Sequence, residues 1–232
     1  MLQQQMNSKN NQFQSTGIGS LYTLQDATIQ YGKIKALDNV QFKVSLGEII
    51  FLTGASGAGK TSLLRLMAGH IDLHQGKIKR PQGDHFVSMI FQDHRFMERK
   101  TCEDNLWVSY DSKIYSNKNE FYKEMIEFAE VLGIKDRLGL KIKDANGGLK
   151  QKVAFIRAML CRPSILIADE PTSSLDYENA KKIYDILNLY NTKRGLTVIW
   201  ASHNKDLVKK FNGRIVHIDK GKIIYSGHAC FI

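Results

Sequence analysis

The chain has 232 residues, of which 43% are apolar and 24% are charged, so it is long enough to bury a sizeable core. This composition excludes fibrous, collagen-like and wholly disordered proteins, and no run of ~20 apolar residues predicts a membrane span. The 33 basic and 23 acidic side chains give a net charge of +10, which favours an anionic partner such as nucleic acid, lipid or nucleotide phosphate. Because the lysines are spread along the chain, a solvated basic face is favoured over a nucleic-acid stripe.

The N-terminal part predicts a flexible leader followed by an antiparallel pair of strands. Residues 1–20 are rich in Gln, Asn and Ser, so they bury too little apolar surface to offset the entropy lost on ordering. They also lack the apolar block of a secretory signal. Residues 21–29 and 36–44 alternate apolar and polar side chains, and the turn-prone residues 31–33 lie between them. We therefore expect one folded domain over residues 21–232.

A buried strand, a glycine-rich loop and a helix are expected next. Residues 48–53 contain a continuous apolar run, which is typical of a strand covered on both faces. Glycines recur over residues 54–59, and a helical stretch follows. The apolar side of that helix is expected to carry Leu63, Leu64, Leu66 and Met67.

Residues 93–147 predict an inserted helical subdomain, because apolar side chains recur there at spacings of three and four. These side chains are Phe121, Met125, Phe128, Ala129 and Leu132.

The C-terminal half returns to alternating strands and helices. Strand-like runs cover residues 164–168 and 196–201, and a helix-like stretch covers 177–189. Residues 214–218 and 222–225 are expected to close the chain as a hairpin. The predicted fold class is therefore α/β, with a mainly parallel core sheet, an N-terminal antiparallel β subdomain and an inserted helical subdomain.

The segment from Gly54 to Thr61 matches the pattern G-x-x-x-x-G-K-[ST] in full, between a predicted strand and a predicted helix. Glycines let the main chain wrap closely around phosphate and turn successive N–H groups inward. Lys60 is expected to reach the β- and γ-phosphates, and Thr61 to offer its hydroxyl to Mg²⁺. The residues predicted to bind nucleotide in this loop are Gly54, Ala55, Ser56, Gly57, Ala58, Gly59, Lys60, Thr61 and Ser62.

Two carboxylates, Asp169 and Glu170, follow the second buried strand. A magnesium nucleotide needs an acidic partner at a strand end beside the phosphate loop, and hydrolysis needs a group that orients and deprotonates water. Asp169 suits the first task and Glu170 the second. Two acids in this position are also compatible with a charge pair at a helix N-terminus, but their combination with the phosphate loop favours the functional interpretation.

Further motifs occur in a fixed order along the chain: Tyr31 before the loop, Gln92 at the end of a predicted strand, a glycine pair at Gly147 and Gly148, and His203 as the last residue of another predicted strand. This order resembles the nucleotide-binding domain of ABC-type ATPases, which have a P-loop NTPase core. The likeness runs from about residue 21 to residue 227. The sequences of segments 51–60 and 89–94 most resemble the FtsE family of bacterial cell-division ATP-binding proteins.

The resemblance implies ATP and Mg²⁺ as ligands and assigns roles to the matching residues. Tyr31 would stack on adenine, Gln92 would touch Mg²⁺ or the attacking water, and His203 would hold the γ-phosphate. Thr61, Gln92 and Asp169 would bind the metal ion. Glu170 would act as the general base, and Lys60, Gln92 and His203 would be the other catalytic residues. In the family two domains face each other head to tail, so an active site requires a homodimer formed on ATP binding.

The segment Ala145–Leu149 departs from the L-S-G-G-Q signature that the resemblance implies. Gly147 and Gly148 are kept, Asn146 replaces the serine, and Leu149 replaces the glutamine. The residues that would contact the nucleotide of the other subunit are then Asn146, Gly147 and Gly148. We expect weakened closure and slow turnover with ATP binding retained, and a faster ATPase when Asn146→Ser and Leu149→Gln restore the signature.

The resemblance favours an ATP-hydrolysing subunit that couples dimer closure to an FtsX-like integral membrane protein in cell division. Its expected place is then peripheral, at the cytoplasmic side of the bacterial inner membrane. The docking surface is expected near Gln92, Phe96, Met97, Trp107 and Tyr110, although burial inside the helical lobe is an equally good reading of these aromatic residues. No nucleic acid partner is expected.

Three alternatives stay open. The chain is compatible with an ATPase subunit of a lipoprotein or peptide exporter, which keeps the chemistry and changes the partner. The altered signature is also compatible with a slow-turnover ATP-dependent scaffold. A DNA-repair ATPase is disfavoured, because only about fifty residues separate Gln92 from the signature and such relatives carry a long coiled coil there.

Overall fold

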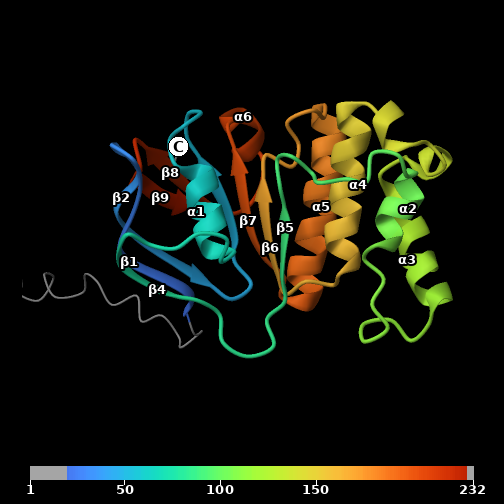
Figure 1. Ribbon diagram of the computed structural model, residues 1–232, viewed down its shortest axis with the longest axis horizontal. Helices are drawn as coiled ribbons and strands as arrows, with labels where there is room; N and C mark the ends of the chain where they lie inside the picture. The colour runs from blue at the N-terminus through green and yellow to red at the C-terminus, as the bar shows by residue number, and fades with distance from the viewer. Residues whose placement is uncertain (1–19, 229–232) are drawn as a thin grey trace, which may run out of the picture.

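The computed structural model describes residues 20–228 of the chain. The predicted leader lies outside the described residues except for Ser20, which is already the first residue of strand β1. The described part contains two β-sheets, and helices lie against the larger one (Figure 1). In that part, no helix combines the length and apolar character that a membrane crossing requires.

The smaller sheet confirms the predicted antiparallel pair. Strand β1 (Ser20–Tyr31) pairs with β2 (Ile34–Ser45) on one side and with β4 (Gln75–Lys79) on the other, both antiparallel. The turn between β1 and β2 needs a left-handed residue, and Gly32 supplies it with φ of 59°. Tyr31 therefore lies at the very end of β1, opposite Ile34 of β2.

The larger sheet has six strands in the order β5-β6-β7-β3-β8-β9. Every pair is parallel except the terminal hairpin of β8 and β9, which confirms the mainly parallel core. The strands are β3 (Ile49–Thr53), β5 (Val87–Ile90), β6 (Ile165–Asp169), β7 (Thr197–Ser202), β8 (Arg214–Asp219) and β9 (Lys222–His228). All residues of β3, β6 and β7 are buried, as expected for strands covered on both faces.

Alternate residues of the central strands divide the apolar core into two layers. Ile50, Ile167 and Ile199 face the layer that contains α1 (Lys60–Met67). Phe51 and Trp200 face the other layer, to which α4 (Gly147–Leu160) and α5 (Tyr177–Arg194) contribute. The short α6 (Lys205–Val208) follows β7. The parallel strands end at one edge of the sheet, and the loops after β3, β5, β6 and β7 meet there.

The predicted helical stretch within residues 93–147 is present as α2 (Cys102–Trp107), α3 (Lys118–Val131) and two 3₁₀ turns, Lys135–Arg137 and Ile142–Asp144. Its predicted apolar face is confirmed, because the five side chains named for it are all buried. Helices α2 and α3 lie at the opposite end of the molecule from the smaller sheet (Figure 1). Treating residues 93–147 as a separate subdomain stays a prediction.

The strand before Gln92 is shorter than predicted. Strand β5 ends at Ile90, and the chain turns at once, with the N–H of His94 donating to the carbonyl oxygen of Phe91 at 3.2 Å. Two consecutive left-handed residues, His94 and Arg95, follow. The guanidinium of Arg157, on α4, donates to the carbonyl oxygens of both. Gln92 therefore projects from a turn fixed by α4 rather than from a strand.

Candidate nucleotide site

The glycine-rich loop connects β3 to α1 and needs glycine at both of its ends. Gly54 and Gly59 have φ of 153° and 111°, and a Cβ at either would collide with a backbone carbonyl oxygen of Ile218 or Ala36. No other residue type tolerates both the torsion and the space. The loop is thus packed closely on the surrounding backbone while its N–H groups stand at the N-terminus of α1, where anions bind.

Lys60 begins helix α1 and is only 7% exposed. Its ammonium donates to the carbonyl oxygens of Gly54 and Ala55 at 2.8 and 3.0 Å. An ammonium carries three donors, so these bonds leave one for a phosphate. The lysine therefore fixes the curvature of the loop and also presents a buried positive charge beside it.

Thr61 and Asp169 are joined by a hydrogen bond of 2.7 Å from the threonine hydroxyl to the carboxylate. Asp169 ends β6 and is 3% exposed, while Thr61 is half-buried in the first turn of α1. The pairing confirms that the acidic strand end lies against the phosphate loop. These oxygen donors, with the amide of Gln92 nearby, fit a hard cation such as Mg²⁺.

The donor set also fits the way in which Mg²⁺ is usually held. Within residues 20–228, His, Cys, Asp and Glu do not gather in groups of three or more that would form a metal cage. Mg²⁺ instead keeps waters and binds through one or two carboxylates together with substrate phosphates. Thr61 and Asp169 would hold it here, and the ion would neutralise charge on the phosphates.

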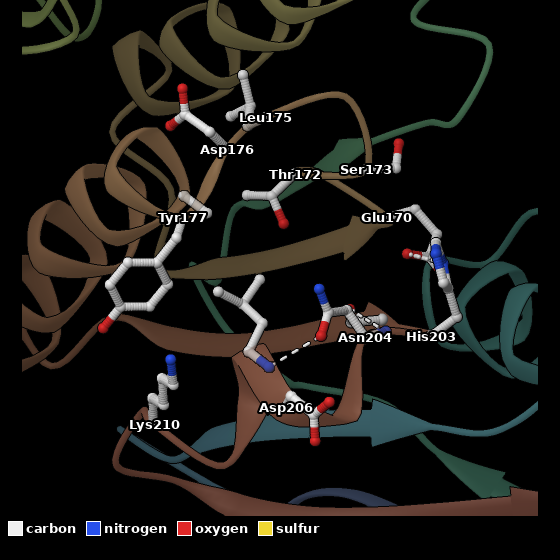
Figure 2. Close-up of a pocket in the computed structure, with 13 residues that line it drawn as sticks. Glu170, Thr172, Ser173, Leu175, Asp176, Tyr177, His203, Asn204, Asp206 and Lys210 are labelled. Atoms are coloured by element: carbon white, nitrogen blue, oxygen red, sulfur yellow. Dashed lines mark hydrogen bonds and ion pairs between the residues drawn. The ribbon is translucent and has the colours of Figure 1, made fainter.

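Glu170 and His203 come together from two neighbouring loops. The carboxylate of Glu170 lies 2.9 Å from Nδ1 of His203, and the two side chains point toward one another in Figure 2. Glu170 has a left-handed backbone with φ of 53°, which is uncommon for a non-glycine residue. Its N–H donates to the carbonyl oxygen of Ala201 at 3.0 Å, so the bond to β7 helps to hold this conformation.

A cavity of about 500 Å³ contains most of the predicted site residues. Those that line it are Tyr31, Ser56, Gly57, Gly59, Lys60, Thr61, Ser62, Gln92, Asp169, Glu170 and His203. Gly54, Ala55 and Ala58 shape the loop without lining the cavity. Tyr31 is 51% exposed at its rim, as a platform for a planar ring requires. A second cavity of about 250 Å³ shares Glu170 and His203 and extends toward α5 and α6 (Figure 2).

The signature residues lie elsewhere in the same chain. Asn146 and Gly148 line a separate cavity of about 260 Å³ together with Ser174 and Asp176. Asp176 caps α5, and the hydrogen bond from the Asn179 N–H lowers the pKa of its carboxyl. One chain therefore brings the loop, the acids and the histidine together but leaves the signature outside the cavity.

Leu149 and Asn146 have structural roles that the motif comparison does not show. The side chain of Leu149 is 7% exposed and belongs to the apolar core, so Leu149→Gln would bury an amide, at about 1–3 kcal/mol if it finds no partner. Asn146 is the N-cap of α4, and its Oδ1 accepts from the Leu149 N–H at 2.9 Å. The restoration expected from both changes is therefore best tested with Asn146→Ser alone.

Sequence reasoning missed several residues at the site. Ile34, Ala36 and Ser173 line the main cavity, and Gln151 links the signature helix to the loop after β6. Ser173 and Gln151 follow the paired acids and the signature within three residues, and this closeness in sequence is the available signal. Ile34 follows from the pairing of β2 with β1, which places it opposite Tyr31, and Ala36 lies two residues further along β2.

This fold and site define a P-loop ATPase domain. The ABC transporter family profile matches residues 37–173, which is more than half of the chain. The chain therefore belongs to the ABC transporter family.

This chain is similar in sequence to two groups of ATP-binding proteins. The methionine import ATP-binding protein MetN of Clostridioides difficile (strain 630) is 33% identical over 220 residues, covering 89% of this chain and 68% of the relative. The cell division ATP-binding protein FtsE of Mycobacterium tuberculosis (strain ATCC 25618 / H37Rv) is 30% identical over 220 residues, covering 88% of this chain and 94% of the relative. The chain thus spans about two thirds of this MetN relative.

The solved structure of MJ0796, described as a dimeric bacterial ABC transporter cassette, has the same fold. It superposes with a TM-score of 0.78 at 24% identity and covers 90% of this chain and 98% of the other.

Proposed function

We propose that this ATPase domain powers an FtsX-like integral membrane partner in a bacterial cell-division complex, at the cytoplasmic side of the inner membrane. The observation that carries the ATPase part is the pair of Glu170 and His203, which faces the phosphate loop across one cavity. Two observations support the choice of partner. The sequences of segments 51–60 and 89–94 resemble FtsE, and the chain is 30% identical to an FtsE over 220 residues.

In ATP hydrolysis, different residues of the site bind the nucleotide, position the reacting groups and transfer the proton. The loop N–H groups and Lys60 bind the phosphates of ATP, and Tyr31 stacks on its adenine with ~1–3 kcal/mol. Bound Mg²⁺ would supply charge neutralisation on the phosphate oxygens. Glu170 accepts a proton from the attacking water, and His203, 2.9 Å from its carboxylate, orients that carboxylate and contacts the γ-phosphate.

Two copies are required because the signature lies outside the cavity of its own chain. Asn146, Gly147 and Gly148 stand at the N-terminus of α4, where backbone N–H groups and the helix dipole attract phosphate. A second copy, placed head to tail, would bring them to the γ-phosphate. ATP then favours the closed pair, and hydrolysis releases it.

ATP-dependent pairing tests this function directly. We expect the purified chain to be monomeric without nucleotide and to form dimers with ATP when Glu170→Gln blocks hydrolysis. Size-exclusion chromatography with light scattering measures the mass. A monomer at saturating MgATP would contradict the pairing, and the absence of ATP binding would contradict the function as a whole.

The surface for the membrane partner is expected around the turn after β5. Phe96, Trp107 and Tyr110 are half-buried and pack against the core cluster that includes the helical lobe. Met97 and Val108 remain 43% and 62% exposed. We therefore define the docking lip as Met97, Arg99, Lys100 and Val108, which combines apolar and basic side chains on one stretch of the lobe.

Charge reversal tests the docking lip. We expect Arg99→Glu with Lys100→Glu to reduce membrane recruitment about tenfold. In the proposed complex the two basic side chains face acidic groups of the partner, and the two glutamates would repel those groups. The matched control is Lys77→Glu with Lys79→Glu, on exposed positions of β4. Membrane fractionation measures recruitment, and equilibrium dialysis checks that both variants bind ATP. Equal fractionation of the two double variants would remove the docking lip from the proposal.

A methionine-type importer is the second candidate, because a MetN relative shares 33% identity. An exporter of lipoproteins or peptides would also keep the site and change only the partner. A photocrosslinking residue at Met97 in the native host identifies the membrane protein that contacts the docking lip. Capture of an FtsX-like protein supports the division role, and capture of an import or export permease replaces it.

Restoring the signature serine is expected to accelerate turnover. Asn146→Ser keeps an N-cap residue of similar strength and supplies a hydroxyl toward the phosphate, so we expect kcat to rise by about three- to tenfold. The matched control is Asn117→Ser, because Asn117 caps α3 through the same contact, at 2.9 Å to the Glu120 N–H. Phosphate release at saturating MgATP measures kcat. An unchanged or lower rate would show that the altered signature does not limit turnover.

A further inference from the structure

Gln151 is a buried amide whose two ends are both engaged. It lies in the second turn of α4 and is 3% exposed, whereas its neighbours Lys150 and Lys152 are half-buried. Its Nε2 donates to Oγ of Ser173 at 2.6 Å and to the carbonyl oxygen of Glu170 at 3.3 Å. Its Oε1 accepts from the N–H of Ser174 at 2.9 Å. The side chain thus connects α4 to the loop that follows β6.

The signature end of α4 packs against the same loop. A Cβ on Gly147 would lie 3.0 Å from Oγ of Ser174, and one on Gly148 would lie 3.2 Å from its carbonyl oxygen. The first turn of α4 and residue 174 are therefore in direct contact. Because a helix rises only ~1.5 Å per residue and is stiff over two turns, Gln151 and the signature must move together.

The bond to the Glu170 carbonyl acts on a residue in an uncommon conformation. Glu170 is left-handed, and such a residue persists only where its surroundings over-determine it. Its N–H is held by Ala201 of β7, and its carbonyl oxygen accepts from Gln151. The direction of its carboxylate, toward His203, is thus fixed from the sheet on one side and from α4 on the other.

We propose that Gln151 is a positioning residue that couples the signature of a subunit to the general base of the same subunit. The coupling between two sites rests on the proposed pairing of ATP-bound copies, in which the signature contacts the nucleotide of the other subunit. ATP bound in one subunit then sets, through α4 and Gln151 of its partner, the orientation of the partner's base. Each site is made competent by occupancy of the other.

Gln151→Leu removes all three hydrogen bonds at similar volume. We expect kcat to fall about 10- to 100-fold with the ATP dissociation constant of the free subunit unchanged within about threefold, because the loop that binds phosphate is not touched. The Hill coefficient of the ATPase is expected to fall to about 1. Amide hydrogen exchange at Ser174, whose acceptor is lost, is expected to become at least about tenfold faster.

The matched control is Asn191→Leu. Asn191 lies near the far end of α5 and also bridges elements with its amide, donating at 2.7 Å to the carbonyl oxygens of Gly47 and Leu196. It measures what the loss of a partly buried amide does to stability without touching the loop after β6. We expect this variant to lower the melting temperature while kcat, the Hill coefficient and exchange at Ser174 stay as in the wild type.

Gln151→Glu adds a readout that a purely structural role would not move. A protonated carboxyl both donates and accepts, as the amide does, whereas a carboxylate only accepts. The activity of this variant relative to the wild type is therefore expected to rise as the pH is lowered from about 8 to 6, because a carboxyl buried beside a carbonyl oxygen protonates readily. The relative activity of Gln151→Leu is expected to show no such rise.

Mixed dimers separate action within a subunit from action across the pair. In dimers of Gln151→Leu with Glu170→Gln, the remaining base lacks Gln151 in its own subunit, and we expect slow turnover. In dimers of the wild type with a subunit carrying both changes, the remaining base keeps Gln151, and we expect a rate about tenfold higher. Equal rates in the two dimers, or a wild-type kcat and Hill coefficient in Gln151→Leu, would overturn the proposal. An inactive wild type would instead contradict the proposed function.

Discussion

Replacing Glu170 with Gln is expected to lower kcat by about 10²- to 10⁴-fold, because the variant loses the carboxylate that accepts a proton from water. The amide keeps the shape of the side chain and can still bond to His203, whose Nδ1 lies 2.9 Å from the carboxylate in the wild type. The loop and Lys60 are not altered, so ATP affinity is expected to change by less than about threefold. Phosphate release and equilibrium binding of ATP measure the two quantities.

The control for this change is Glu178→Gln, on the exposed first turn of α5, where the same loss of charge is expected to leave kcat unaltered. Two results would contradict the role of Glu170. Unchanged turnover would place the base elsewhere. A host in which a membrane complex with Glu170→Gln works normally would favour the slow scaffold, in which ATP closes the dimer and hydrolysis is incidental.

The fold and the position of the acidic strand end beside the phosphate loop can be predicted from the sequence because their signals are local. The continuous apolar run before Gly54 and the paired acids after Ala168 each mark the end of a buried strand, and parallel strands bring such ends to one edge. Thr61 and Asp169 are 108 positions apart in sequence, yet the two motifs predict that both lie at one site, and a hydrogen bond of 2.7 Å joins them there. The expected roles of Tyr31, Gln92 and His203, in contrast, follow only from the resemblance to the family.

The helical periodicity of the sequence predicts that Leu149 is buried, whereas the signature motif predicts a polar side chain at this position. Leu149, Val153 and Ile156 recur at spacings of four and three, which predicts one buried helical face, and all three are buried. In the expected signature, a glutamine occupies the position of Leu149. The periodicity of the helix was the better guide to where this side chain lies.

The contacts of Gln151 could not be predicted, because they depend on how α4 packs against the loop after β6. A glutamine two residues beyond the signature is typical of an exposed helix surface, and its partners Ser173 and Ser174 are more than 20 positions away. The same holds for Arg157, whose guanidinium reaches the carbonyl oxygen of His94 across 63 positions. Such bridges need the angle between two elements, which hydrophobic patterns do not give.

Replacing Lys60 with Met is expected to weaken ATP binding by about 30- to 4,000-fold. Losing one partner of a buried, hydrogen-bonded charge pair costs about 2–5 kcal/mol, and each ~1.4 kcal/mol is tenfold in affinity. Methionine keeps the apolar stem inside the site, where Lys60 is 7% exposed. The free energy of unfolding is therefore expected to change little, because removing a buried charge offsets the loss of its two bonds to Gly54 and Ala55.

Titration calorimetry with MgATP and thermal unfolding separate the two roles of Lys60, with Lys193→Met, on the last turn of α5, as the control for the loss of one charge. If the ammonium mainly contacts phosphate, affinity falls while the melting temperature stays within a few degrees of the wild type. If it mainly holds the loop, both fall together and the salt dependence of ATP binding is unchanged. A lower affinity with a weaker salt dependence than the wild type is the result we expect, because the missing interaction is between charges.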